Sequence, residues 1–195
     1  MTLEIRALSR AEVEARLDDL ATLRITVFRA FPYLYDGDRS YEASYLRAYT
    51  ESPDALVVGC FDGERLVGAA TGAPMEDHAA EFAEALAAAG IDPSQTWYCG
   101  ESVLLPACRG QGVYRRFFEL REAAGRALRR RHSVFCAVIR RPDDPRRPAD
   151  YAPLDPIWQR YGYRCIEGAE ARFPWRDIGD AAETEKPMSL WIKSL

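Results

Sequence analysis

The 195-residue sequence predicts one α/β (α+β) domain, in which helices flank a mixed, mostly antiparallel twisted sheet with a central strand–helix–strand crossover. Three observations predict this class. Apolar residues recur at helical spacing in two long segments, Glu12–Phe31 and Val113–Arg131. Short apolar runs, one of which ends at the hairpin-turn pair Asp62-Gly63, have the length of strands. From Trp97 to Ile139 a strand, a glycine turn, a helix and a strand follow in the order of a right-handed crossover with parallel strands.

The other elements follow in chain order. Ser9 is placed to cap the first helix, and an aromatic, turn-prone loop separates this helix from a short one at Tyr41–Glu51. Further along, the sequence predicts strands at 55–61, 65–70, 97–105, 133–139, 163–166 and 188–192, and helices at 79–89 and 156–161. Because no repeat or long linker interrupts this order, we expect a single domain over residues 1–195.

Composition and charge exclude several classes of protein. The net charge is −4, and wholesale nucleic-acid binding normally needs a basic face. No apolar stretch is long enough to span a membrane, and the first ten residues lack the apolar core of a secretory signal. The five cysteines are odd in number and form no CxxC pair, which argues against a disulfide framework or a metal site. We therefore expect a protein of the reducing cytoplasm that needs no metal.

The most informative segment is the turn Arg109-Gly110-Gln111-Gly112, which follows a strand ending at Pro106 and opens the helix at Val113. Glycine allows positive φ and lets the backbone approach a ligand closely. The first amides of a helix lack intrahelical partners, and with the helix dipole they favour a phosphate or pyrophosphate. Arg109 adds positive charge. A Walker A loop and a complete GxGxxG fingerprint are both absent from the sequence.

This segment resembles the acetyl-CoA motif of the GNAT superfamily, in which Arg-Gly-x-Gly follows a strand ending in proline and precedes a helix. Ala107 and Tyr114 depart from the pattern, since the family has Gln or Arg and a small residue there. The closing WQRYGY, with Gly162-Tyr163, resembles the end of the family's last helix. The resemblance implies the GNAT fold and an N-acyltransferase that uses acetyl-CoA or another acyl-CoA. It implies a coenzyme site made of Val103, Leu104, Leu105, Arg109, Gly110, Gln111, Gly112, Val113 and Tyr114.

Acyl transfer to an amine needs a base, because an amine with a pKa of about 10.4 is mostly protonated at neutral pH. Glu101 is the first candidate by resemblance, since many GNAT enzymes carry a glutamate on this strand; alternatively it pairs with an arginine, for example one from the Arg-rich loop. The resemblance also assigns the amides near Leu104 and Leu105 to the thioester carbonyl. Trp158 stands at the usual place of an acid tyrosine. Tyr161 and Tyr151 are therefore alternative acids, or else packing aromatics.

Two loops are expected to build the acceptor site, by resemblance. Tyr33, Tyr35 and Asp36 of the first loop offer ring faces and a carboxylate to an amine, whereas Arg140 of the second offers a cation to a carboxylate or a phosphate. If both contribute, the acceptor is a small molecule with an amine and a carboxylate. Two alternatives remain: a GNAT-fold acyl-CoA sensor without catalysis, and a phosphate binder that does not use coenzyme A. Dimers are common in the GNAT superfamily, so the resemblance also allows a homodimer.

Overall fold

The protein forms one seven-stranded sheet with helices on both faces, in a computed structural model that describes residues 2–195. The strands are β1 (Glu4–Ala7), β2 (Leu56–Asp62), β3 (Arg65–Pro74), β4 (Thr96–Leu104), β5 (His132–Val138), β6 (Arg164–Trp175) and β7 (Thr184–Ser194). Their order across the sheet is β1-β2-β3-β4-β5-β7-β6. β4 and β5 are parallel and the other neighbours are antiparallel, which confirms the predicted mixed, mostly antiparallel sheet.

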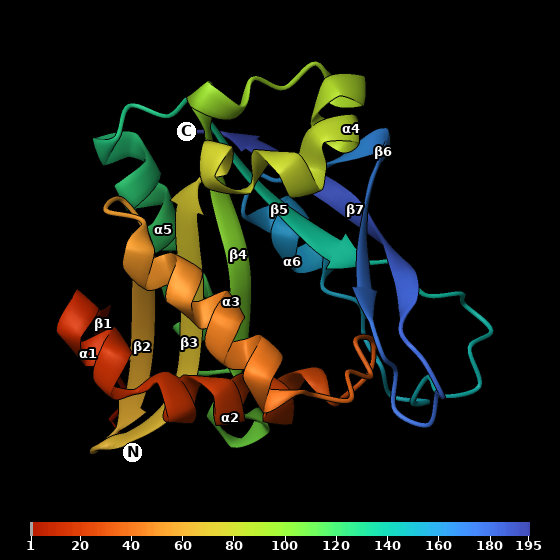
Figure 1. Ribbon diagram of the computed structural model, residues 1–195, viewed down its shortest axis with the longest axis horizontal. Coiled ribbons are helices and arrows are strands. Elements are labelled where there is room, and N and C mark those ends of the chain that lie inside the picture. Colours follow the sequence, from red (N-terminus) through yellow and green to blue (C-terminus); the bar gives the residue numbers. More distant parts are fainter. Residues whose placement is uncertain (1) are drawn as a thin grey trace.

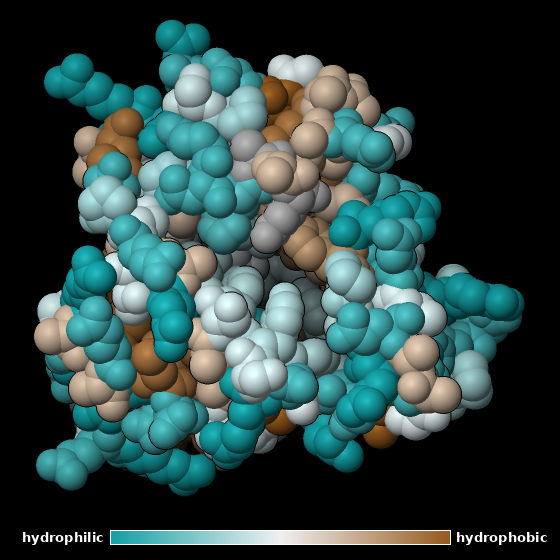
Figure 2. Space-filling model, in the orientation of Figure 1, coloured by the Kyte–Doolittle hydropathy of each residue, from teal (hydrophilic) through white to brown (hydrophobic). Residues whose placement is uncertain are grey.

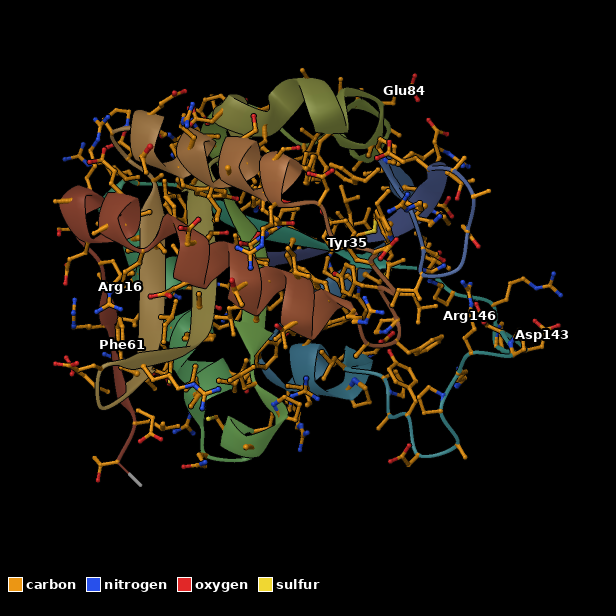
Figure 3. All side chains as sticks on the ribbon, turned by 60° about the horizontal axis from the view of Figure 1, so that its bottom comes forward. Arg16, Tyr35, Phe61, Glu84, Asp143 and Arg146 are labelled. Carbon is orange, nitrogen blue, oxygen red and sulfur yellow. The ribbon has the colours of Figure 1, made fainter. Side chains whose placement is uncertain are left out.

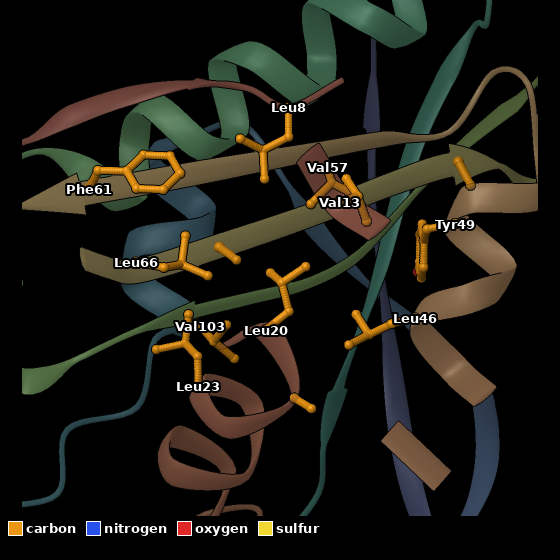
Figure 4. Close-up of a cluster of buried hydrophobic side chains, with 13 residues drawn as sticks. Leu8, Val13, Leu20, Leu23, Leu46, Tyr49, Val57, Phe61, Leu66 and Val103 are labelled. Carbon is orange, nitrogen blue, oxygen red and sulfur yellow. The ribbon is translucent and has the colours of Figure 1, made fainter. Parts of the chain in front are cut away.

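The helices divide between the two faces of the sheet. They are α1 (Arg10–Ala15), α2 (Leu17–Phe28), α3 (Arg39–Glu51), α4 (Ala79–Ala89), α5 (Val113–Ala127) and α6 (Asp155–Arg160). Residues alternate along each strand, so Val57 packs with α1–α3 in the cluster of Figure 4, whereas Val58 packs with α5 on the opposite face. α4 packs mainly against β6, and α6 packs on the face of α5. Each face of the sheet therefore has its own core.

The parallel strands β4 and β5 pair only at their first residues. Thr96–Tyr98 of β4 lie opposite His132–Val134 of β5, and beyond this point the two strands diverge (Figure 1). The second half of β4 thus keeps β3 as its neighbour on one side and has no strand partner on the other among the described residues. This gap lies at the centre of the sheet, beside the turn that opens α5.

Several predicted boundaries are wrong. The expected helix Glu12–Phe31 is two helices, α1 and α2, with a break at Arg16. Ser9 does cap α1, through a capping box with Glu12. Strand β1 was not predicted, because four residues at a sheet edge give almost no periodic signal. β6 and β7 are longer than expected, because β6 is an edge strand whose exposed positions include the charged residues Arg164, Glu167, Glu170 and Arg172, which interrupt any apolar run. No helix in the described chain is long and apolar enough to cross a membrane.

Candidate active site

The glycine turn opens α5 in the manner the sequence predicts. Gly110 and Gly112 have φ values of 77° and 79°, in the left-handed region that glycine occupies without strain. Gly112 is the N-cap of α5 and has no side chain to accept from the amides that follow. The residues on either side of the exposed turn, Cys108 and Val113, are buried and anchor it. The helix therefore presents uncapped amides toward solvent.

The charges around this turn are the reverse of those at an ordinary helix start. The first turn of α5, as the structure describes it, has no acidic residue, and Arg115 and Arg116 lie near the start of the helix. Both arginines pair with Glu119, one turn further along the helix, at 3.4 and 3.1 Å. Cations near a helix N-terminus oppose the dipole, by about 0.3–1 kcal/mol each. This arrangement becomes favourable when an anion such as a pyrophosphate lies over the helix end.

The free edge of β4 begins close to this turn. The Leu105 amide donates to the carbonyl oxygen of Val67 on β3, at 2.9 Å, so this amide faces the neighbouring strand. Because backbone groups alternate along an antiparallel strand, those of Leu104 face the opposite edge. The Leu104 carbonyl accordingly accepts from Arg109 Nε at 3.4 Å. Of the two expected amides, that of Leu104 alone points into the gap between β4 and β5.

A β-bulge in β4 decides where Glu101 points. Cys99 lies opposite Gly72 and Ser102 opposite Ala70, so two residues of β4 oppose Thr71 alone. The extra residue turns the Glu101 side chain onto the face covered by α2 and α3. Gly100 must be glycine, because a Cβ there would overlap the Tyr49 hydroxyl and lie 2.6 Å from Thr71 Oγ1.

The carboxylate of Glu101 enters a buried charge cluster, which we define as Arg24, Glu42 and Glu101. Arg24 Nη1 lies 2.5 Å from Glu101 Oε2, and Arg24 Nε donates to Glu42. Tyr45 donates its hydroxyl to the same Glu101 oxygen. Burial opposes the charge of Arg24, but Glu101, Tyr45 and Glu42 outweigh it and hold the arginine's pKa well above its usual value.

This cluster is almost dry and carries a net charge of −1 when both carboxylates are ionised. Arg24 is 6% exposed and Glu42 is fully buried. Among the described residues, no hydrogen bond reaches Glu101 Oε1, although Oε2 is fully engaged. The partner of Glu101 is therefore Arg24 of α2, not an arginine of the Arg-rich loop.

A cavity of about 150 Å³ opens on this carboxylate. The space-filling view is hollowed near its centre, between α3, α4 and the β6–β7 hairpin (Figure 2). Most of its wall is aromatic, with contributions from both sides of the β4–β5 gap. The lining residues are Arg24, Phe28, Tyr33, Tyr35, Tyr41, Tyr45, His78, Tyr98, Gly100, Glu101, Cys136, Phe173, Pro174, Trp175 and Met188.

The structure brings three of the predicted catalytic and acceptor residues, Glu101, Tyr33 and Tyr35, into the wall of this cavity. Burial raises the pKa of both tyrosines, so both hydroxyls stay protonated at neutral pH. Figure 3 shows Tyr35 toward the middle of the molecule, whereas Asp143 and Arg146 lie on a loop that projects away from it. The projecting part of the Arg-rich loop is thus remote from the cavity.

Four other predicted residues lie elsewhere, since the described wall of the cavity includes neither Asp36, Arg140, Tyr151 nor Tyr161. Asp36 pairs with Arg176 at 2.7 Å. Arg140 makes two bonds to Asp177, at 2.6 and 2.9 Å, and also binds the carbonyl oxygens of Pro32 and Tyr33. Tyr151 packs edge-on against Phe31, and Tyr161 packs against Phe118. Asp36 and Arg140 therefore hold the loops together.

Tyr114, the bulky departure in the glycine turn's helix, leans toward α6. Its ring packs against Phe118, and its oxygen accepts a hydrogen bond of 2.8 Å from Trp158 Nε1. Burial raises the pKa of the Tyr114 hydroxyl to about 12. Trp158, at the place of the family's acid tyrosine, also packs between Phe135 and Trp191. The two departures from the family pattern, Tyr114 and Trp158, are therefore hydrogen-bonded to each other.

Sequence reasoning missed Arg24, Glu42, Tyr45 and Gly100. Arg24 lies on the apolar stripe of its helix, four residues after Leu20, and a charged residue at such a position is a usable signal. Gly100 inside an apolar strand is another, because glycine there often marks a bulge or a close approach. No local signal identifies Glu42 or Tyr45, whose roles depend on contacts with distant segments.

Comparisons with known proteins identify the fold. No family model matches the chain. No curated protein matches its sequence. The aminoglycoside 6'-acetyltransferase type Ii has a similar structure, with a TM-score of 0.60, 13% identity and coverage of 98% of this chain and 96% of that one. An acetyltransferase of the GNAT family from Streptococcus pneumoniae has a TM-score of 0.60 and 12% identity, with both chains fully covered. PaiA N-acetyltransferase from Thermoplasma acidophilum, solved in complex with coenzyme A, has a TM-score of 0.53 and 11% identity, again with full coverage of both. The chain therefore has the fold of the GNAT acetyltransferases, as the resemblance of its glycine-turn segment predicted.

Proposed function

We propose that this protein transfers an acyl group from an acyl-CoA to the amine of a small molecule. The observation that carries the proposal is the placement of two groups on one strand. β4 brings the Glu101 carboxylate into the aromatic cavity, and a few residues later it leads into the uncapped, arginine-flanked start of α5. A base and an anion site thus flank the gap between β4 and β5.

The donor side is assigned to the turn and the free edge of β4. The amides that follow Gly112, with Arg109, Arg115 and Arg116, suit a pyrophosphate, and the free backbone groups of Leu104 suit an amide chain lying in the gap. The fit agrees with the coenzyme A bound to the Thermoplasma neighbour. Acyl-CoA supplies the activated acyl group when bound. Val103 and Val113 contribute packing, since their side chains are buried in the cores.

Glu101 is assigned as the base. The acceptor enters as an ammonium, and the net negative charge of the cluster favours this cation in a site shielded from water. Arg24 and Tyr45 hold Oε2, which leaves Oε1 to take the proton. We assign no proton donor to Tyr151 or Tyr161, because both lie outside the described wall of the cavity. A thiolate is a tolerable leaving group without one.

The first experiment is a thermal-shift comparison of acetyl-CoA with ATP and NAD, followed by thiol release from acetyl-CoA with a panel of amines. We expect acetyl-CoA alone to raise the melting temperature, and at least one amine to release thiol. Glu101→Gln is expected to lower kcat by about 10²- to 10⁴-fold and to leave acetyl-CoA affinity unchanged. Glu122→Gln is the matched control, since Glu122 is a buried carboxylate outside the cavity that pairs with Lys193. No shift with acetyl-CoA would overturn the proposal.

One observation favours a second function, that of an acyl-CoA-binding module without catalysis. The ion pair with Arg24 occupies one oxygen of Glu101 and gives this carboxylate a structural role. The same experiment separates the two functions. Acetyl-CoA binding without turnover on any amine supports the binding module, whereas turnover that falls steeply in Glu101→Gln supports the enzyme.

A further inference from the structure

The acceptor cavity has one chemical character over most of its wall. Five tyrosines, two phenylalanines and Trp175 line it. The rings pack in two groups: Tyr33 lies 4.5 Å from Phe28 and 5.9 Å from Trp175, and Tyr41 stacks on Tyr45 at 6.3 Å. Such a wall binds apolar ring surface, and its π faces also attract a cation. The hydroxyls of the tyrosines leave room for a few polar contacts.

The charged side chains of the described cavity wall favour one cation and include no free Lys or Arg for an anion. Glu101 is the single carboxylate among the described residues of the wall, and Arg24 is the single Lys or Arg. Arg24 is already bound to Glu42 and Glu101, and its guanidinium stacks over Tyr45 at 3.9 Å. Any carboxylate of an acceptor would therefore enter a negatively charged, mostly aromatic site without a free Lys or Arg partner. Burying an unpaired charge in this way is strongly unfavourable.

The two groups that could have supplied a second charge contact are engaged outside the cavity. Arg140 is saturated by Asp177 and by two carbonyl oxygens, and Asp36 pairs with Arg176. An amino acid therefore lacks a cation for its carboxylate. For a polyamine or an aminoglycoside, the described cavity wall holds no second carboxylate to pair with the additional ammonium groups. The cavity volume of about 150 Å³ accommodates one benzene-sized ring.

We propose that the acceptor is a primary alkylamine that carries one aromatic ring and no carboxylate, the class of which phenylethylamine is the simplest member. The ring lies among the tyrosines and Trp175, and the ammonium meets Glu101 Oε1. The acyl transfer forms the amide C–N bond and breaks the thioester C–S bond. Glu101 takes one proton of the ammonium, coenzyme A leaves as the thiolate, and the second proton lost by the nitrogen goes to that thiolate. This inference rests on the proposed function, because it assigns the substrate of the same site.

The sharpest test compares phenylethylamine with phenylalanine, which share ring, chain and amine and differ by one carboxylate. Thiol release from acetyl-CoA gives kcat/KM for each, with spermidine and an aminoglycoside as further arms. We expect kcat/KM for phenylethylamine to exceed that for phenylalanine by at least about 100-fold, because the carboxylate has no partner in the cavity. Equal or better turnover of phenylalanine, or a preference for spermidine or the aminoglycoside, would overturn the inference and leave acyl transfer intact.

A variant with an added cation makes the test specific to this cavity. Tyr41 lines the wall and is 51% exposed, so Tyr41→Arg places a guanidinium at the mouth with little demand on folding. In this variant, we expect the ratio of kcat/KM for phenylethylamine to kcat/KM for phenylalanine to fall about tenfold or more. Ala48→Arg is the matched control, since Ala48 is exposed on the same helix and outside the wall, and it should keep the original ratio. An unchanged ratio in Tyr41→Arg would count against the assigned cavity.

Binding separates failure of this inference from failure of the proposed function. If no amine releases thiol, calorimetric titration with phenylethylamine and phenylalanine still compares the two ligands. Tighter binding of phenylethylamine would support the proposed class of amine and overturn only the proposed acyl transfer. Equal binding, or no binding, would overturn the proposed class of amine as well.

Discussion

The guanidinium of Arg121 donates a hydrogen bond of 2.8 Å to the main-chain carbonyl oxygen of Glu101, from the helix on the opposite face of the sheet. The same nitrogen reaches the Thr71 carbonyl oxygen at 3.4 Å, so one buried arginine holds both strands at the β4 bulge. Arg121 is 1% exposed and also stacks on Phe118. The orientation of the Glu101 side chain therefore depends on a residue that does not touch the cavity.

Arg121→Met should lower kcat by at least about tenfold while leaving the dissociation constant of acetyl-CoA unchanged. The bulge loses the hydrogen bonds of Arg121, and small displacements of the proposed base lower the rate strongly. Arg126→Met on the same helix is the control, because Arg126 is half-exposed and pairs with Glu122 instead. Steady-state kinetics and titration with acetyl-CoA check the split. A loss of stability with unchanged kcat would show that Arg121 has a structural role alone.

Arg24→Met should destabilise the fold by about 3–5 kcal/mol, because Glu42 and Glu101 would remain buried without their cation. The double variant Arg24→Met/Glu42→Met removes one of the two stranded carboxylates and should recover roughly 2 kcal/mol of that loss. Urea unfolding of both single variants and the double variant measures the coupling. Additive destabilisation by the two substitutions would contradict a shared cluster.

Arg115→Gln/Arg116→Gln should weaken acetyl-CoA binding about tenfold, since both arginines lie at the α5 terminus assigned to the pyrophosphate. Without ligand, the free energy of unfolding should change by no more than about 0.5 kcal/mol. The lost contacts to Glu119 are exposed, and removing two cations from the helix N-terminus removes their repulsion by the helix dipole. Arg129→Gln/Arg131→Gln removes two exposed arginines beyond the other end of the helix and controls for the same change of net charge. Equal weakening in the control would move the coenzyme site away from this turn.

The capping box at the start of α1 should account for part of the loss of stability at low pH. A hydrogen bond from Arg6, and then bonds from the amide and hydroxyl of Ser9, lower the pKa of Glu12 from 4.5 to about 2. Because the folded-state pKa is depressed, the stabilisation is complete above pH 4.5 and is lost as the pH falls toward 2. Glu12→Gln should flatten the fall of melting temperature across this window. Glu14→Gln, on the same helix with an exposed contact to Arg10, should not.

How much of the site was predictable depends on the range of the interactions involved. The conformation of the turn Arg109–Gly112 was predictable because a strand end, two glycines and a helix start are local features. Glu101 was predictable as a candidate by resemblance and by the cost of a carboxylate in an apolar strand. Its partners were not, because Tyr45 and Glu101 are 56 positions apart and meet only when α3 packs on β4.

By itself the sequence determined the fold class, the crossover and the glycine turn, because hydrophobic period and backbone conformation are set over a few neighbouring residues. Tertiary structure alone decided three things. It turned Glu101 toward the helices through a bulge held by Arg121, it engaged Arg140 and Asp36 in loop contacts, and it joined Tyr114 to Trp158. The physical reason is that burial and charge pairing depend on which distant segments meet, and no local pattern records those meetings.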